Sequence, residues 1–362
     1  MDLNPWRKTL RFTALAQVQH VRPVSPAVAR DLVARVYAEL ERDFGVLAPP
    51  VALHSPAPEV MAAAWMAFRE CVLAEGRAAR TIKEALAAAV SAANTCPYCA
   101  TVHGAALNSL TGGEHAAAVA GGHFDRVQDP AIRATAEWAR TAAVRDTVAE
   151  QPPFSIEQAP ELLGVALVFH YINRMVNVFL PEAPMPPRAP GAALGIVTRL
   201  IGARIRAAAA RSHPAGASLA LLPDAPLPED LEWAVGSPTV AGALARAAAA
   251  VDKAGESAVP RSVQAMVHAQ LQGWDGRPPD LDRTWLHEAV RQLPPEDRPA
   301  GRLALLVALA SWQIDASVLA DYRATAATDR ALIELTSWAA QTAARTIVSW
   351  SPAAWAQTVY EP

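Results

Sequence analysis

Apolar positions along this chain recur at helical spacing, and no segment shows the convincing alternation of apolar and polar residues that marks a half-buried strand. Stretches rich in Ala and Leu favour helix, and the clusters of Pro, Gly and Asp between them favour turns. The pattern therefore predicts an all-α protein. In the first half the predicted helices lie at about residues 26–44, 58–75, 80–93, 96–109, 114–120, 129–146, 156–161 and 162–180.

Two proline-rich stretches, residues 181–191 and 213–230, interrupt this helical pattern. Proline removes a backbone donor and clashes with the preceding turn, so neither stretch continues a helix. The predicted division is a first unit at 1–180, a linker region at 181–230 with one helix at about 192–211, and a last unit at 231–362. The linker helix is amphipathic, with Arg on one side. A membrane-surface helix is conceivable, but a connecting helix packed on the body is favoured.

The two halves resemble each other weakly in sequence. Residues 129–143 are similar to 328–344, and each segment carries a tryptophan, Trp138 and Trp338, at a matching position after an aspartate. A duplication within the chain is the favoured interpretation, although a shared helical pattern without common descent stays possible. Both tryptophans are expected to be core aromatic residues.

A second pair of segments, 83–103 and 302–322, precedes these repeats in the same order. A gap-free pairing sets Asp315 opposite Cys96, Val318 opposite Cys99 and Tyr322 opposite His103. If the duplication is real, the last unit is a degenerate copy that has lost every candidate reactive group and serves as a packing partner.

Composition narrows the class of protein. The chain has 362 residues, 52% of them apolar, and a formal charge of −3 with Lys and Arg scattered, so nothing indicates a nucleic-acid partner. The start lacks the apolar core of a secretory signal, and strongly apolar runs such as 303–312 are about half of a bilayer span. A soluble, cytoplasmic protein is expected. In a reducing cytosol, a close pair of cysteines is more often redox-active or metal-binding than structural.

Cys96, Cys99 and His103 carry the clearest chemistry in the chain. Asn94 and Thr95 interrupt the preceding helix and are good N-cap residues, and Pro97 is tolerated in the first turn of a new helix. On that helix the three side chains share one face. The first-turn cysteine would lie where free N–H groups stabilise a thiolate, and His103 would lie one turn beyond Cys99, where it can take a proton from the thiol.

Glu84 lies among alanines and a leucine on the helix that leads into this segment. A carboxylate in apolar surroundings has a raised pKa and can shuttle protons near neutral pH. The alternative is a solvent-facing Glu beside Lys83, and the residues alone leave both open.

Glu84, eleven intervening residues, the Cys96-Pro97-Tyr98-Cys99 segment, three residues and His103 together resemble the alkylhydroperoxidase D and carboxymuconolactone decarboxylase family, in its peroxidase-like branch. The similarity covers about residues 55–180. It implies a compact all-α helical bundle that forms homo-oligomers and binds no tight cofactor. It also implies reduction of a hydroperoxide or another small electrophile, with electrons from an external dithiol donor, either a lipoyl group or a thioredoxin-like protein.

The resemblance also assigns roles to the residues. Cys99 would attack the peroxide and Cys96 would resolve the product into a disulfide, although the reverse assignment stays open. His103 and Glu84 would form a proton relay, through water. Some relatives carry a histidine between the cysteines, where this chain has Tyr98, which could hydrogen-bond the site. The branch that decarboxylates a muconolactone lacks the cysteine pair.

Several alternatives compete with the peroxidase interpretation. The same dithiol could serve as a disulfide oxidoreductase without a peroxide step. Zinc is disfavoured because C-x2-C-x3-H offers three ligands and structural zinc needs four. The two cysteines could be inert core residues. The protein could then be a catalytically silent helical scaffold or a regulatory binding protein.

The remaining candidates are expected to be structural. Cys71 is interpreted as a small core residue, and His170 as a satisfied core histidine that could also line a pocket. Asn173 and Arg174 could both face the same cleft or an oligomer interface. His20, His115 and His123 belong to no constellation and are expected on the surface.

Overall fold

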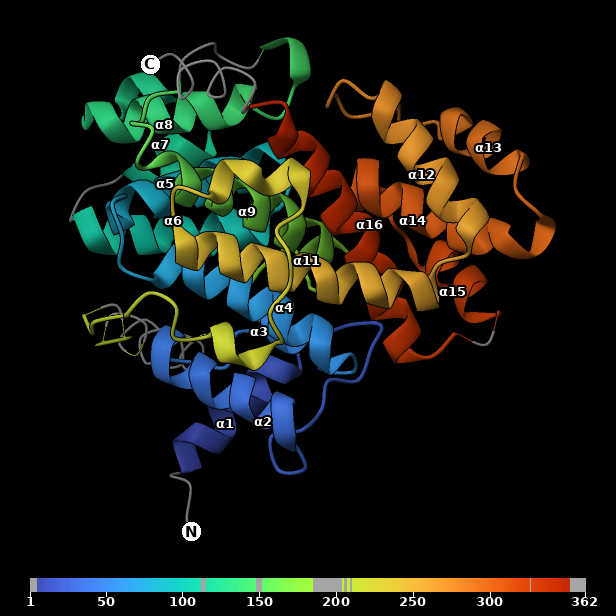
Figure 1. The fold of residues 1–362 in the computed structure, drawn as a ribbon, viewed down its shortest axis with the longest axis horizontal. Helices are drawn as coiled ribbons and strands as arrows, with labels where there is room; N and C mark the ends of the chain where they lie inside the picture. Colours follow the sequence, from blue (N-terminus) through green and yellow to red (C-terminus); the bar gives the residue numbers. More distant parts are fainter. Residues whose placement is uncertain are drawn as a thin grey trace.

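The fold is known from a computed structural model that describes residues 5–111, 115–147, 152–184, 204, 207–208, 210–325 and 327–351. All regular elements in these residues are helical and none is a strand, which confirms the all-α prediction (Figure 1). The α-helices are α1 (Pro5–Leu15), α2 (Asp31–Glu39), α3 (Pro49–Ala52), α4 (Pro58–Phe68), α5 (Arg80–Ala93), α6 (Pro97–Thr111), α7 (His115–Ala120), α8 (Pro130–Thr141), α9 (Ala159–Phe179), α11 (Pro238–Ala258), α12 (Arg261–Gly273), α13 (Thr284–Arg291), α14 (Arg298–Ala310), α15 (Ala316–Arg323) and α16 (Asp329–Ser349).

Most predicted helices are present, with shifted ends. The predicted helix at 80–93 coincides with α5, and π-helical turns prolong α2 to Phe44 and α4 to Leu73. The separate helices predicted at 156–161 and 162–180 are wrong: α9 is one continuous helix, because Pro160 lies in its first turn where no internal N–H partner is needed. The helix predicted at 192–211 falls almost entirely outside the described residues.

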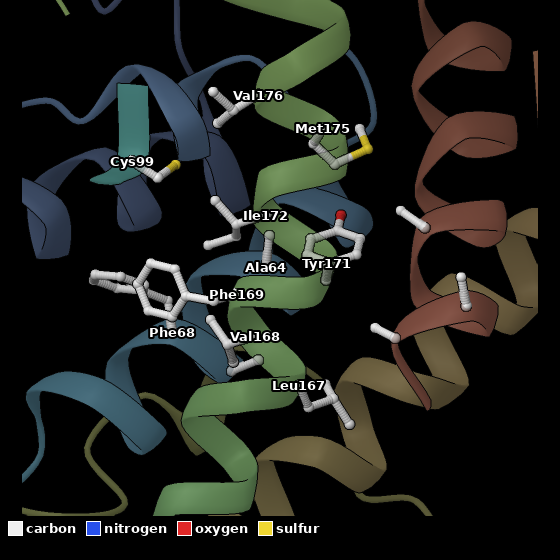
Figure 2. Packing of buried hydrophobic residues seen from close by; sticks show 14 of the residues in the cluster. Ala64, Phe68, Cys99, Leu167, Val168, Phe169, Tyr171, Ile172, Met175 and Val176 are labelled. Atoms are coloured by element: carbon white, nitrogen blue, oxygen red, sulfur yellow. The ribbon is translucent and has the colours of Figure 1, made fainter. Parts of the chain in front are cut away.

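Helix α9 is the central element of the molecule. It is long and apolar enough to cross a bilayer, but 94% of its most apolar stretch is buried inside the protein. Figure 2 shows Phe169, Ile172 and Val176 on the side of α9 that faces Cys99, whereas Tyr171 and Met175 point toward α16. The helix is therefore a core element enclosed by other helices.

The two halves of the chain pack closely on each other. Helix α4 lies along α11 and α9 lies along α16, and the buried residues of both halves form one continuous core. Trp138 and Trp338 are both 4% exposed, as expected for core residues. The boundaries 1–180, 181–230 and 231–362 stay a prediction.

Candidate active site

A tight turn between α5 and α6 brings the motif together. Asn94 ends α5, Thr95 takes a left-handed conformation with φ 53°, and the N–H of Cys96 donates to the carbonyl of Ser91 at 2.9 Å. The N-cap roles predicted for Asn94 and Thr95 are wrong. An N-cap residue has extended backbone, which Thr95 lacks, and the Asn94 amide is instead bonded to Asn173 at 2.9 Å.

The two cysteines are reduced and buried, with exposed fractions of 1% for Cys96 and 2% for Cys99. Burial opposes ionisation of Cys96, but hydrogen bonds from the Cys99 thiol, the Cys99 N–H and the Asn173 amide outweigh it and lower the pKa of Cys96. Burial and the adjacent Cys96 raise the pKa of Cys99 well above its ordinary value. When the reduced pair loses one proton, the negative charge therefore lies on Cys96, at the helix start, and the remaining proton on Cys99.

The two sulfurs differ in their ease of ionisation and in their access to the cavity. Cys99 lines a cavity of about 350 Å³, whereas Cys96 is not among the residues that form its wall. A small reactant in the cavity meets Cys99 first. For Cys99 to act as a nucleophile, its proton must first leave, and the hydrogen bond to Cys96 offers a direct route.

Glu84 is completely buried and lies between two cationic or protonatable partners. Its carboxylate accepts a hydrogen bond from Nδ1 of His103 at 2.7 Å and one from Arg80 Nη2 at 2.6 Å. The alternative of a solvent-facing Glu84 is therefore wrong. Lys83 does not join this group, because its ammonium pairs with Glu161 at 2.7 Å.

The raised pKa expected for Glu84 is also wrong. Burial does oppose its ionisation, but the charges and hydrogen bonds of Arg80 and His103 outweigh burial and lower the pKa of Glu84 to about 2. Glu84 is thus a fixed anion at neutral pH. In the neutral His103 ring the proton lies on Nδ1, facing this anion, which leaves Nε2 free to accept.

His103 and Cys99 line the same cavity but do not touch through a hydrogen bond in the part of the chain that the structure describes. The imidazole instead packs edge-on against Phe169, with ring centroids 4.5 Å apart.

Tyr98 occupies the wall of the cavity, and it does not bond either sulfur. Its hydroxyl donates to Oε1 of Gln17 at 3.2 Å, which joins α6 to the segment after α1. Burial and the two neighbouring cysteines raise the pKa of Tyr98, so it stays protonated. The expected contact of Tyr98 with the reactive groups is replaced by a contact with the cavity wall.

Asn173 is a functional candidate that the motif did not reveal. It is fully buried on α9, its amide donates to Ser91 Oγ at 3.0 Å, and it lies beside both sulfurs. The sequence did contain one sign of a polar site on this helix: three polar residues lie about one turn apart among apolar ones, His170, Asn173 and Asn177. Arg174 diverges from Asn173 and donates to the Ala308 carbonyl of α14 at 3.0 Å, so the two do not face one cleft.

The other candidates are structural. His170 is buried beside Asn94 and does not line the cavity, and burial lowers its pKa well below the ordinary value. Cys71 is a core residue whose pKa burial raises to about 12. His20 and His123 are exposed as expected, whereas His115 is only partly exposed. Among the described residues no three His, Cys, Asp or Glu side chains are placed to hold a metal ion.

Comparison with known proteins places the chain in a family. Residues 58–141 match the model of the carboxymuconolactone decarboxylase family. A protein of Mycobacterium tuberculosis (strain ATCC 25618 / H37Rv), named alkyl hydroperoxide reductase Rv2159c, is 37% identical over 341 residues, which are 93% of this chain and 96% of that protein. No solved structure matches the chain significantly. On this evidence, together with the cysteine motif, the chain belongs to the alkylhydroperoxidase D-like carboxymuconolactone decarboxylase family.

Proposed function

We propose that the protein is a thiol-dependent peroxidase, an alkyl hydroperoxide reductase that cycles between a Cys96/Cys99 dithiol and a disulfide. The observation that carries the proposal is the opening of Cys99, one of two hydrogen-bonded cysteines, onto a cavity that His103 also lines. Family membership and the name of the similar mycobacterial protein support the same activity.

The first step moves charge to the accessible sulfur. The Cys99 thiol passes its proton to the Cys96 thiolate along their hydrogen bond, and the Cys99 thiolate attacks the terminal oxygen of the hydroperoxide. The S–O bond forms, the O–O bond breaks, and Cys99 becomes a sulfenic acid. The leaving alkoxide takes a proton, delivered from solvent by His103 through water, and departs as the alcohol.

The second step regenerates the pair. The Cys96 sulfur attacks the Cys99 sulfenic acid, forming the S–S bond, and the hydroxyl leaves with the Cys96 proton as water. An external dithiol then reduces the disulfide by exchange and is itself oxidised to a disulfide. Because both sulfurs are at most 2% exposed, a slender lipoyl arm reaches them more readily than a thiol on a folded surface does.

Glu84 and His103 have different roles in the proposed proton relay. A carboxylate with a pKa of about 2 does not exchange protons near neutral pH, so the role of Glu84 is to orient His103 through its hydrogen bond to Nδ1. His103 carries the proton. A cytoplasmic location and a homo-oligomeric assembly are part of the proposal, because a reducing compartment keeps the donor reduced and family members oligomerise.

Intact mass measurement after brief exposure to stoichiometric cumene hydroperoxide tests the cycle. Wild type should lose about two mass units as the disulfide forms, and Cys96→Ser should accumulate a sulfenic acid on Cys99. Cys99→Ser should stay unoxidised. Cys71→Ser is the matched control and should behave as wild type, because Cys71 is buried away from the cavity. Unoxidised thiols in all four proteins would refute the proposed activity.

A further inference from the structure

A chain of hydrogen-bonded polar side chains joins the end of α5 to α9, and none of its members lines the cavity. Asn94, the residue at which α5 ends, is contacted by three side chains of α9. Its amide donates to Oδ1 of Asn173 at 2.9 Å and lies 3.1 Å from Nδ1 of His170. Its backbone carbonyl accepts from Asn177 at 3.4 Å. Asn173 in turn reaches Ser91 Oγ at 3.0 Å, so α5 holds this amide from two places.

The direction of each hydrogen bond around Asn173 is fixed from one end of the chain. The Ser91 hydroxyl has one proton, and it donates that proton to the Ala87 carbonyl at 2.7 Å. Ser91 Oγ must therefore accept from Asn173, and only the NH2 end of that side chain can donate. The carbonyl end of Asn173 then faces Asn94, which must present its own NH2 group. The reverse orientation of the Asn173 amide would leave two acceptors facing each other at Ser91.

The second N–H of the Asn173 amide serves the cysteine pair. The Asn173 side chain hydrogen-bonds both Cys96 and Cys99, and in each case the bond favours the thiolate. The other hydrogen bonds that favour the Cys96 thiolate come from the neighbouring Cys99. Asn173 is therefore the contribution of a different helix, and it acts through a dipole whose orientation its two partners on α5 fix.

The ionisable side chains of the site other than the cysteines do not supply this stabilisation. On α9, His170 stays neutral because burial and the charge of Arg174 lower its pKa well below the ordinary value. Arg174 itself donates to backbone carbonyls of α9 and α14. On α5 and α6, Glu84 and His103 bond each other, and Tyr98 stays protonated. None of these groups is among the influences on the pKa of Cys96, so a neutral amide has the part that a cation has in other thiolate sites.

We propose that Asn94 and Ser91 are positioning residues for the dithiol, which hold the Asn173 amide with its second N–H toward the sulfur of Cys96. The inference rests on the proposed function and adds two residues that the cysteine motif leaves unspecified. In the proposed first step the Cys96 thiolate takes the proton of Cys99. The orientation of this amide therefore sets the pH at which the pair becomes reactive.

Asn94→Leu tests the inference, because leucine branches like asparagine but cannot donate to Oδ1 of Asn173. The ultraviolet absorbance of the thiolate, followed against pH, should show the first thiolate forming about one pH unit higher than in wild type. The rate constant for oxidation by cumene hydroperoxide should fall by up to about tenfold at pH 7 and recover at higher pH. Asn177→Ala removes a contact to the Asn94 backbone but none to its side chain, and this control should titrate like wild type.

A double-mutant cycle separates positioning from a direct effect on the sulfur. Asn94→Leu added to Asn173→Ala should shift the thiolate midpoint no further than Asn173→Ala does alone. Ser91→Ala leaves the amide held at one end only, so it should raise the midpoint in the same direction and should likewise add nothing to Asn173→Ala. This second variant tests the inference even if Asn94→Leu fails to fold. Additive shifts, or a loss of rate that is equal at every pH, would overturn the inference.

The thiolate titration needs no peroxide, so it is independent of the proposed function. Unchanged midpoints in Asn94→Leu and Ser91→Ala, with normal disulfide formation in wild type, would overturn the inference and leave the proposed function standing. A wild-type protein that cumene hydroperoxide does not oxidise would refute the proposed function, whatever the midpoints.

Discussion

Nδ1 of His103 donates a 2.7 Å hydrogen bond to Glu84, and the other oxygen of the same carboxylate pairs with Arg80. Glu84 and His103 lie on consecutive helices that pack against each other, α5 and α6, and both side chains are buried. The Glu84 carboxylate therefore stays an anion at neutral pH, and its hydrogen bond fixes the orientation of the His103 imidazole. We accordingly expect His103, and not Glu84, to carry the proton.

Glu84→Gln should make the protein less sensitive to acid. The pKa of Glu84 is about 2 in the folded protein against an ordinary 4.5. The stability from this group is thus fully present above about pH 4.5 and is lost as the pH falls toward 2. The loss amounts to about 3 kcal/mol. Urea unfolding at pH 7, 5, 4 and 3 should show a shallower decline of the free energy of unfolding for Glu84→Gln. Glu137→Gln, at an exposed carboxyl, should decline like wild type. Parallel declines in all three proteins would contradict the pKa assignment.

Arg80→Gln should shift the acid limb of the pH profile of kcat/KM to higher pH. The charge of Arg80 is the largest of the influences that lower the pKa of Glu84. Without Arg80, Glu84 should take up a proton at a higher pH and then no longer accept the hydrogen bond from Nδ1 of His103. Arg80→Lys keeps the positive charge and should keep most of the wild-type profile. A uniform loss of activity at every pH, with no displacement of the limb, would indicate a structural role only.

Asn173→Ala should raise the pKa of Cys96. The Asn173 amide stabilises charge on the pair, and hydrogen bonds to charged groups contribute about 1.5–3 kcal/mol, or about one pKa unit or more. The ultraviolet absorbance of the thiolate, followed against pH, measures this shift. Asn177→Ala is the control on the same helix, since its amide bonds Ser311 Oγ and the Asn94 carbonyl. An equal shift in both variants would show a general disturbance of α9.

Gly164→Ala should destabilise the protein without altering the dithiol chemistry. A methyl group at this position would lie 2.7 Å from the Cys71 sulfur, in a fully packed region of the core. Overpacking of this kind costs about 1–3 kcal/mol. Adding Cys71→Ala removes the colliding sulfur and should recover part of the lost free energy of unfolding in a double-mutant cycle. Strictly additive effects would show that the sulfur is not what the new methyl meets.

Local sequence determined the helices and the order of reactive groups along them. The helix at 80–93 and the next one, with Cys99 and His103 one turn apart, depend on apolar spacing and on turn residues within about thirty positions. For the same reason the all-α class, the burial of Trp138 and Trp338 and the core position of Cys71 could be predicted. The predicted ends of the helices were less accurate. Pro160 indicated the end of one helix in the sequence, but in the structure it lies inside the first turn of α9.

Tertiary structure decided how these groups behave. Whether Glu84 carries a raised or a lowered pKa depends on the position of Arg80 and on the angle at which the next helix delivers His103. The lowered pKa of Cys96 depends on hydrogen bonds from Cys99 and from Asn173, and Asn173 reaches the sulfurs from α9, far along the chain. The cavity opposite Cys99 exists because α1 folds over a site that lies much later in the sequence. Charge, proton affinity and cavity shape are set by contacts between distant segments, and helical periodicity carries no information about those contacts.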